Sequence, residues 1–179
     1  MENLRKHNDE FVKSKAYEAY ATSKFPDKKT AIVSCMDTRL VTMLPAALGI
    51  KNGDVKMIKN AGGLVTDPFG DSMRSLLVAV YELGVENIMI IAHTNCGVEG
   101  MRGDHFLHIM EERGISRQTM EELKSSGHDL EAWLTGFTDT EKAVRESVEL
   151  VSSHPLLPKG IKVEGYVIDT VTGKLNEVK

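Results

Sequence analysis

Several residue types and patterns are scarce in this chain of 179 residues, and each scarcity narrows the class of protein. Only two cysteines occur; they could form one disulfide, but without a secretion signal we expect a reducing compartment, where thiols are more often metal ligands or catalytic groups. No apolar run approaches the roughly 20 residues that cross a bilayer, and the polar residues 1–6 lead into no apolar signal core. We therefore expect no membrane partner and a cytoplasmic location, where thiols stay reduced.

Charge and length exclude further classes. The net charge of −4 combines mixed signs along the chain and leaves no basic stripe that would bind nucleic acid. With 179 residues, 41% of them hydrophobic, the chain is long enough for one domain with its own core and too short for two. This composition is compatible with an enzyme that acts on a small molecule.

Four short apolar runs predict the strands of a parallel sheet. They are rich in Ile and Val and lack polar alternation, which is typical of strands buried on both faces. The four runs are residues 31–34, 55–58, 87–92 and 163–168. Helical patterns lie between them, and alternating strands and helices imply right-handed crossovers in an α/β fold.

Two helices and one hairpin carry clear boundary signals. Asp71 is the predicted cap of a helix that ends at Gly84. The capping box at residues 138–141 predicts the start of a second amphipathic helix. Residues 167–178 predict a hairpin that turns at Thr172-Gly173 and adds an antiparallel edge strand.

The two cysteines lie in contexts that suit a metal better than a core. Cys35 begins the sequence Cys-Met-Asp-Thr-Arg, and His93 and Cys96 frame His-Thr-Asn-Cys. Two thiolates and one imidazole suit Zn²⁺, and three protein ligands leave a fourth position open for a water. The predicted strands place all three residues at carboxyl ends, where parallel sheets form ligand crevices. The alternative is that the cysteines are small buried hydrophobes.

Asp37 and Arg39 follow the first cysteine closely and predict a catalytic pair. Zinc lowers the pKa of a bound water from about 15.7 toward about 7, which provides hydroxide at neutral pH. Asp37 would accept a hydrogen bond from that hydroxide, and Arg39 would hold Asp37 ionised through a charge-assisted bond. The alternative is an ion pair or helix cap without a catalytic role.

Two further groups of residues are open to a binding interpretation. The backbone amides of Ala61, Gly62 and Gly63 can approach a bound bicarbonate closely because glycine has no side chain, although a strand-to-loop turn explains these glycines equally well. His105 and His108 share one face if their segment is helical, and together with Glu112 they suggest a second metal site. A solvated helix face is the more frequent meaning of such a pattern.

The order and spacing of these motifs resemble the β-class carbonic anhydrases. Cys-x-Asp-x-Arg, followed about sixty residues later by His-x-x-Cys-Gly, is similar to the zinc signature of that family. The resemblance continues through residues 59–63, 74–76 and 165–175 and spans about residues 29 to 178. Lys59 stands where relatives usually have Arg, and Asn95 where they usually have Asp.

The resemblance implies a three-layer α/β/α fold, with a mostly parallel sheet of four strands and an antiparallel C-terminal edge strand. It implies reversible hydration of carbon dioxide to bicarbonate and a proton by zinc-bound hydroxide. Cys35, His93 and Cys96 would bind Zn²⁺, and Asp37 and Arg39 would form the catalytic dyad. One alternative is a carbon disulfide or carbonyl sulfide hydrolase on the same zinc site, and another is a noncatalytic zinc protein in which Asp37 permanently fills the fourth position.

The N-terminal segment predicts association. We interpret residues 1–28 as a helical arm and residues 29–179 as a single zinc-binding α/β domain. Residues 8–23 read as one helix with apolar groups such as Phe11 and Tyr20, and a helix at a chain end has few neighbours of its own to cover them. In the resembling family such an arm packs on the partner subunit, so we expect a homodimer or a higher homo-oligomer.

Overall fold

A five-stranded sheet lies at the centre of the structure, a computed structural model that describes residues 1–179. The strands are β1 (Thr30–Cys35), β2 (Val55–Asn60), β3 (Asn87–His93), β4 (Lys162–Ile168) and β5 (Leu175–Val178). Their spatial order is β2-β1-β3-β4-β5, in which the first four run parallel and β5 pairs antiparallel with β4. The four predicted strands and the antiparallel edge strand are therefore confirmed.

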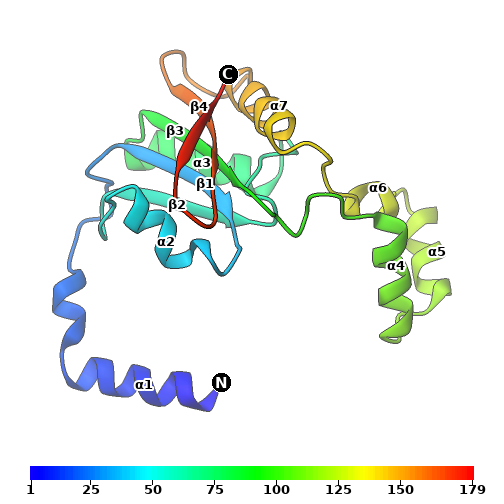
Figure 1. The fold of residues 1–179 in the computed structure, drawn as a ribbon, viewed down its shortest axis with the longest axis horizontal. Coiled ribbons are helices and arrows are strands. Elements are labelled where there is room, and N and C mark those ends of the chain that lie inside the picture. Colours follow the sequence, from blue (N-terminus) through cyan, green and yellow to red (C-terminus); the bar gives the residue numbers. More distant parts are fainter.

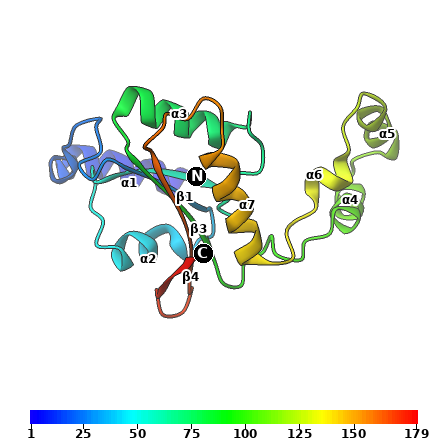
Figure 2. The same ribbon diagram turned by 90° about the horizontal axis from the view of Figure 1, so that it is seen from above.

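Helices cover both faces of the sheet and make the predicted three layers (Figures 1 and 2). On one face, α3 (Asp71–Leu83) and α7 (Thr140–Ser152) pack over a core that includes Val33 and Ile90. On the other face, α2 (Leu40–Ala47) packs over Ile32 and Ile91. Neighbouring residues of one strand thus enter opposite cores, which explains why the strands read as continuous apolar runs.

The starts of α3 and α7 differ by one residue from the sequence prediction. Gly70 occupies the N-cap of α3, and Asp71 is the first helical residue and makes no capping hydrogen bond. In α7 the cap is Asp139, whose carboxylate accepts a hydrogen bond from the Lys142 amide at 2.9 Å. Threonine and aspartate are both good capping residues, so the two adjacent positions offer two possible helix starts, and the structure uses the second. Gly84, in the left-handed region at φ 71°, ends α3 as predicted.

The C-terminal hairpin turns earlier than predicted, because Asp169 ends β4. The Asp169 carboxylate accepts hydrogen bonds from the amides of Val171 and Thr172, at 3.0 and 2.7 Å. It also accepts one from the Thr172 hydroxyl at 2.8 Å. These bonds compete with strand pairing, so β4 stops at Ile168 and residues 169–174 form the connection.

The N-terminal segment projects from the body and is not one helix (Figure 1). It consists of α1 (Glu2–Lys13) and a 3-10 helix, η1 (Ala16–Tyr20), so the prediction of a single helix over residues 8–23 is wrong. The break lies at Lys15, which adopts the left-handed region with φ 57°. None of the residues of α1 and η1 is buried. The division into an arm and a domain stays a prediction.

A second projection, which we call the helical unit, contains α4 (Gly103–Glu112), α5 (Arg117–Ser125) and α6 (Leu130–Leu134) (Figures 1 and 2). Two linkers join it to the body, and their backbones pair. The Gly100 amide donates to the Phe137 carbonyl at 2.7 Å, and the Gly136 amide to the Met101 carbonyl at 2.8 Å. The sequence analysis did not predict this unit. No helix of the structure has both the length and the hydropathy needed to span a bilayer.

Candidate metal centre

The three predicted ligands converge at the carboxyl end of the sheet. Cys35 is the last residue of β1, His93 is the last residue of β3, and Cys96 follows three residues later. Because β1 and β3 are adjacent and parallel, their ends lie side by side. All three residues are buried, and their ligand atoms lie within 4.8 Å of one another. The two sulfur atoms are 4.0 Å apart.

The geometry of this cluster fits a zinc ion. A tetrahedral ion with Zn–S bonds of about 2.3 Å would separate two sulfurs by roughly 3.8 Å, close to the observed distance. His93 Nε2 is the one buried side-chain nitrogen or oxygen atom that has no hydrogen-bond partner. His93 Nδ1 lies 2.9 Å from the Thr94 carbonyl oxygen, which fixes the proton on Nδ1 and leaves the Nε2 lone pair for a metal.

The protonation chemistry of the thiols also favours a cation. Burial raises the pKa of the Cys96 thiol above its ordinary value, and the neighbouring Cys35 raises it further. The buried Cys96 thiol therefore resists ionisation unless positive charge is close. A divalent metal supplies that charge and binds the thiolate form directly.

Beside the cluster, Arg39 grips the carboxylate of Asp37 at two points. Arg39 Nε donates to Asp37 Oδ1 at 2.9 Å and Nη2 donates to Oδ2 at 2.8 Å, while the Arg39 backbone amide donates to Oδ1 at 2.9 Å. These bonds hold the pKa of Asp37 well below its usual range and raise the pKa of Arg39. Asp37 Oδ2 lies 3.9 Å from His93 Nε2, so the carboxylate borders the ligand cluster.

Arg39 is anchored in turn by two other segments. Its Nη2 donates to the Asn95 carbonyl at 2.9 Å and its Nη1 to the Thr170 hydroxyl at 3.4 Å. The Thr170 amide donates to the Thr94 hydroxyl at 3.0 Å. Asn95 has φ 54°, a left-handed conformation that asparagine tolerates better than most residues. Sequence reasoning missed Thr94 and Thr170, which only the pairing of β3 with β4 brings together.

The loop of residues 61–63, which contains Gly62 and Gly63, packs against β1, the strand that ends in Cys35. Gly63 has φ 72°, and a Cβ atom at this position would lie 2.5 Å from the Cys35 nitrogen, so the fold requires glycine here. The Gly63 amide donates to Asn60 Oδ1 at 2.9 Å. Of the three amides predicted to contact substrate, those of Ala61 and Gly62 therefore remain for such a role. Asn60 was not recognised in the sequence analysis.

Lys59, noticed in the sequence only as a departure from the resembling family, contacts the first ligand strand. Its Nζ donates to the Ser34 hydroxyl and to the Cys35 carbonyl, each at 3.0 Å. Burial lowers the pKa of Lys59, while the nearby Cys35 and Asp37 raise it. The ammonium group is thus part of the electrostatic surroundings of the cluster.

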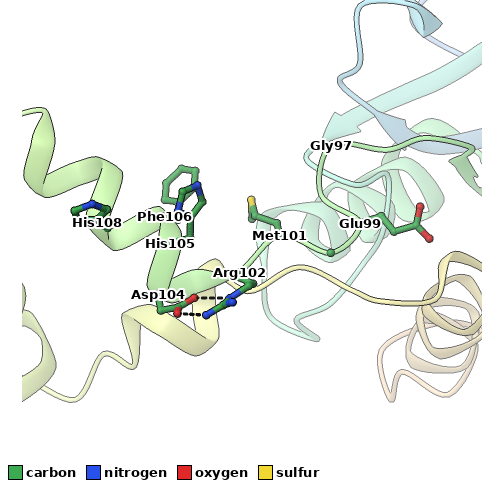
Figure 3. Close-up of a pocket in the computed structure, with 9 residues that line it drawn as sticks. Gly97, Glu99, Met101, Arg102, Asp104, His105, Phe106 and His108 are labelled. Atoms are coloured by element: carbon green, nitrogen blue, oxygen red, sulfur yellow. Dashed lines mark hydrogen bonds and ion pairs between the residues drawn. The ribbon is translucent and has the colours of Figure 1, made fainter.

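The structure gathers no second metal site around His105 and His108. Both line a surface pocket of about 600 Å³ between the Cys96 loop and the helical unit (Figure 3). Arg102 pairs with Asp104 in this pocket, and His108 Nε2 lies 3.5 Å from Glu112. The only group of three or more His, Cys, Asp and Glu side chains with metal-binding geometry is the one at Cys35. Both histidines are exposed, as a solvated helix face requires.

The match to known proteins covers nearly the whole chain, including the residues of this cluster. The sequence model of the family described as carbonic anhydrase matches residues 30–175. YvdA of Bacillus subtilis, provisionally named a carbonic anhydrase, is 49% identical over 176 residues, which cover 98% of this chain and 89% of that protein. The crystal structure of β-carbonic anhydrase isoform I from Trichomonas vaginalis superposes with a TM-score of 0.88 at 36% identity, covering 99% of this chain and 96% of that one. A carbon disulfide hydrolase of Acidithiobacillus thiooxidans is 31% identical over 157 residues, covering 83% of this chain and 76% of that protein.

Proposed function

This chain belongs to the β-carbonic anhydrase family, and we propose that it catalyses the reversible hydration of carbon dioxide at a zinc ion held by Cys35, His93 and Cys96. The observation that carries the proposal is the buried cluster in which His93 Nε2 has no hydrogen-bond partner. When bound there, zinc would lower the pKa of a coordinated water toward about 7 and so supply the nucleophile at neutral pH.

The role of Asp37 is to accept a hydrogen bond and to orient the nucleophile toward carbon dioxide. Its Oδ2 lies 3.9 Å from His93 Nε2, beside the space into which the three ligands point. The two-point contact with Arg39 keeps the carboxylate ionised and fixes its plane. The same contact keeps Asp37 paired with Arg39. It therefore supports an arrangement in which the fourth metal position is open to water, rather than one in which Asp37 permanently fills it.

The product bicarbonate carries a negative charge that needs hydrogen-bond donors. The backbone amides of Ala61 and Gly62 supply them in this proposal, because Gly63 already donates to Asn60. Backbone amides are fixed in direction, so they bind an oxyanion without the cost of ordering a side chain. Arg39, which pairs with Asp37, adds a positive charge beside the site.

Metal analysis followed by stopped-flow kinetics tests the proposed function. Protein purified from zinc-replete medium should contain about one zinc per chain and accelerate carbon dioxide hydration. Replacing His93 with Ala should remove most of the zinc and the activity, whereas His128→Ala, at an exposed position outside the cluster, should change neither. Zinc-loaded protein without measurable hydration activity would contradict the proposed reaction.

The second candidate reaction is hydrolysis of carbon disulfide or carbonyl sulfide at the same site. The relative from Acidithiobacillus thiooxidans, which carries the name carbon disulfide hydrolase, is the observation that favours it. Measuring hydrogen sulfide release from carbon disulfide with the same zinc-loaded preparation decides between the two. A rate with carbon disulfide above that with carbon dioxide would make the sulfur compound the substrate.

We also propose a homodimer in the cytoplasm as the state in which the enzyme works. The support for the dimer is the N-terminal segment, whose two helices contain no buried residue although Phe11 and Tyr20 present aromatic rings. A second copy of the chain would cover these groups.

A further inference from the structure

The side chain of Asn60 makes a hydrogen bond at each of its four available positions. Its Oδ1 accepts from the amides of Gly63 and Leu64, at 2.9 and 3.2 Å. Its Nδ2 donates to the Leu64 carbonyl at 2.6 Å and to the Ser72 hydroxyl at 2.8 Å. A carboxamide has two donor and two acceptor positions, whereas an aspartate of the same shape lacks the donors. Asparagine therefore matches all the groups around this position.

The backbone of Asn60 lies directly beside the first predicted metal ligand. Asn60 is the last residue of β2 and is the register partner of Cys35 on β1. Its carbonyl accepts a hydrogen bond from the Met36 amide at 2.8 Å. Its side-chain partner Ser72 belongs to the first turn of α3. Asn60 thus joins three segments, which are the end of β1, the loop of residues 61–63 and the start of α3.

Four consecutive backbone amides after Asn60 divide into two pairs. Those of Gly63 and Leu64 are bound by Asn60, whereas those of Ala61 and Gly62 donate to no acceptor within the chain. Gly62 is buried, and buried backbone amides are nearly always paired with protein, water or ligand. Two adjacent amides without an acceptor are suitable donors for a bound oxyanion.

A largely apolar cavity borders these residues. Asn60 and Ala61 line a pocket of about 590 Å³ together with Val98 and Phe137. The same two apolar side chains face Gly62, because a Cβ atom added at Gly62 would lie 3.4 Å from Phe137 and 3.9 Å from Val98. Hydrogen bonds to a charged ligand are stronger beside apolar side chains than in open water.

We propose that Asn60 is a positioning residue, which fixes the loop of residues 61–63 so that the amides of Ala61 and Gly62 bind bicarbonate. This inference rests on the proposed function, which places bicarbonate at these two amides. Asn60 holds the two following amides and so restricts the directions of the peptide groups before them. Donors that are fixed in advance bind an oxyanion without an ordering cost. Without Asn60, the ligand itself would have to order the loop.

The first test measures bicarbonate binding to the zinc-loaded protein by NMR of the backbone amides. Bicarbonate should shift the resonances of Ala61 and Gly62 in the unchanged protein and give a dissociation constant. Asn60→Ala should raise that constant about 10-fold, which corresponds to weakening one hydrogen bond to a charged group. The matched control is Asn176→Ala, which changes an exposed asparagine on β5 and should leave the constant unchanged.

The second test uses the kinetics of bicarbonate dehydration and distinguishes positioning from a general loss of stability. Asn60→Ala should raise KM for bicarbonate about 10-fold and keep kcat within about threefold, because the amides bind substrate and transition state alike. Ser72→Ala removes one partner of Asn60 and should raise KM about threefold. Val85→Ala, which opens a cavity before the amino end of β3, should lower the Tm and leave KM unchanged.

The outcomes separate this inference from the proposed function. Unchanged KM and dissociation constant in Asn60→Ala would overturn the role of Asn60 while the zinc enzyme stands. An equal rise of KM in Val85→Ala at the same loss of Tm would also overturn it, because stability alone would explain the effect. If Asn60→Ala fails to fold, Ser72→Ala provides the same two measurements. Zinc-loaded unchanged protein that does not hydrate carbon dioxide would instead contradict the proposed function.

Discussion

Arg39 holds both carboxylate oxygens of Asp37, at 2.9 and 2.8 Å, although only one residue separates the two in sequence. A second pair in this chain, Arg102 and Asp104, has the same separation and a similar two-point contact. What distinguishes Asp37 is its surroundings, because its other side faces His93 at 3.9 Å, whereas Arg102 and Asp104 lie exposed at the start of α4. Position beside the ligand cluster, rather than the ion pair itself, is what makes Asp37 a candidate for catalysis.

Replacing Asp37 with Asn should leave zinc bound and lower the rate of carbon dioxide hydration by about 10²-fold or more, because the amide accepts more weakly and no longer pairs with Arg39. The matched control is Asp104→Asn, which breaks the exposed pair and should keep full activity. Stopped-flow rates and zinc content decide the outcome. Full activity in Asp37→Asn would show that the pair of Asp37 and Arg39 has no catalytic role.

The pH dependence of activity should show one ionisation near neutral pH. Activity should rise above about pH 7, as expected for a zinc enzyme that needs hydroxide. Hydrogen bonds from Arg39 lower the pKa of Asp37, so this carboxylate stays ionised even below its ordinary pKa, and its contribution is lost only as pH falls through the lowered value. A second ionisation between pH 4 and 6 that disappears in Asp37→Asn would contradict this assignment.

Removal of the metal should destabilise the fold. The apoprotein would bury two thiols beside the unpaired Nε2 of His93, and ligand binding to the native state alone adds stability by mass action. We expect the Tm to fall by about 10 °C after chelation. Zn²⁺ should restore the Tm and Mg²⁺ should not, because magnesium prefers oxygen ligands. An unchanged Tm would argue against a metal at this cluster.

Gly63→Ala should destabilise the protein by about 2 to 5 kcal/mol, since it combines a left-handed backbone with steric overlap. The new Cβ would lie 2.5 Å from the Cys35 nitrogen, at a φ of 72°. Gly84→Ala is the matched control, with φ 71° and no atom within 4 Å of the added carbon. It should cost only about 1 to 2 kcal/mol. Urea unfolding measures the free energy of unfolding of both variants. Equal losses of stability would show that β1 shifts at Cys35 to accommodate the new methyl group.

The chain should have a mass in solution of at least twice 19.8 kDa, as measured by light scattering. Phe11→Asp should reduce association, because Phe11 packs against Tyr20 in a segment without buried residues. Asp9→Asn, which changes an exposed polar residue of the same helix, serves as the control. A mass of 19.8 kDa for the unchanged chain at all concentrations would exclude a dimer.

The sequence by itself determined the features that depend on local pattern and on the chemistry of single residues. The four parallel strands followed from short Ile- and Val-rich runs, since burial on both faces removes polar alternation. The group of Cys35, His93 and Cys96 followed from donor type and from the ends of those strands. Gly84 marked the end of α3 because glycine accepts a left-handed backbone.

Tertiary structure alone decided which distant residues meet and where local signals compete. Arg39 reaches Thr170 across 131 positions only because β4 lies beside β3 and brings its end to the cluster. Lys59 contacts Cys35 through the register of β2 on β1. The cap of α7 is Asp139 rather than the adjacent Thr138, and the break at Lys15 lies in a left-handed backbone conformation that no local signal marked. Local sequence thus specified the strands of the sheet and the candidate ligands, and sheet order and register specified the contacts that surround them.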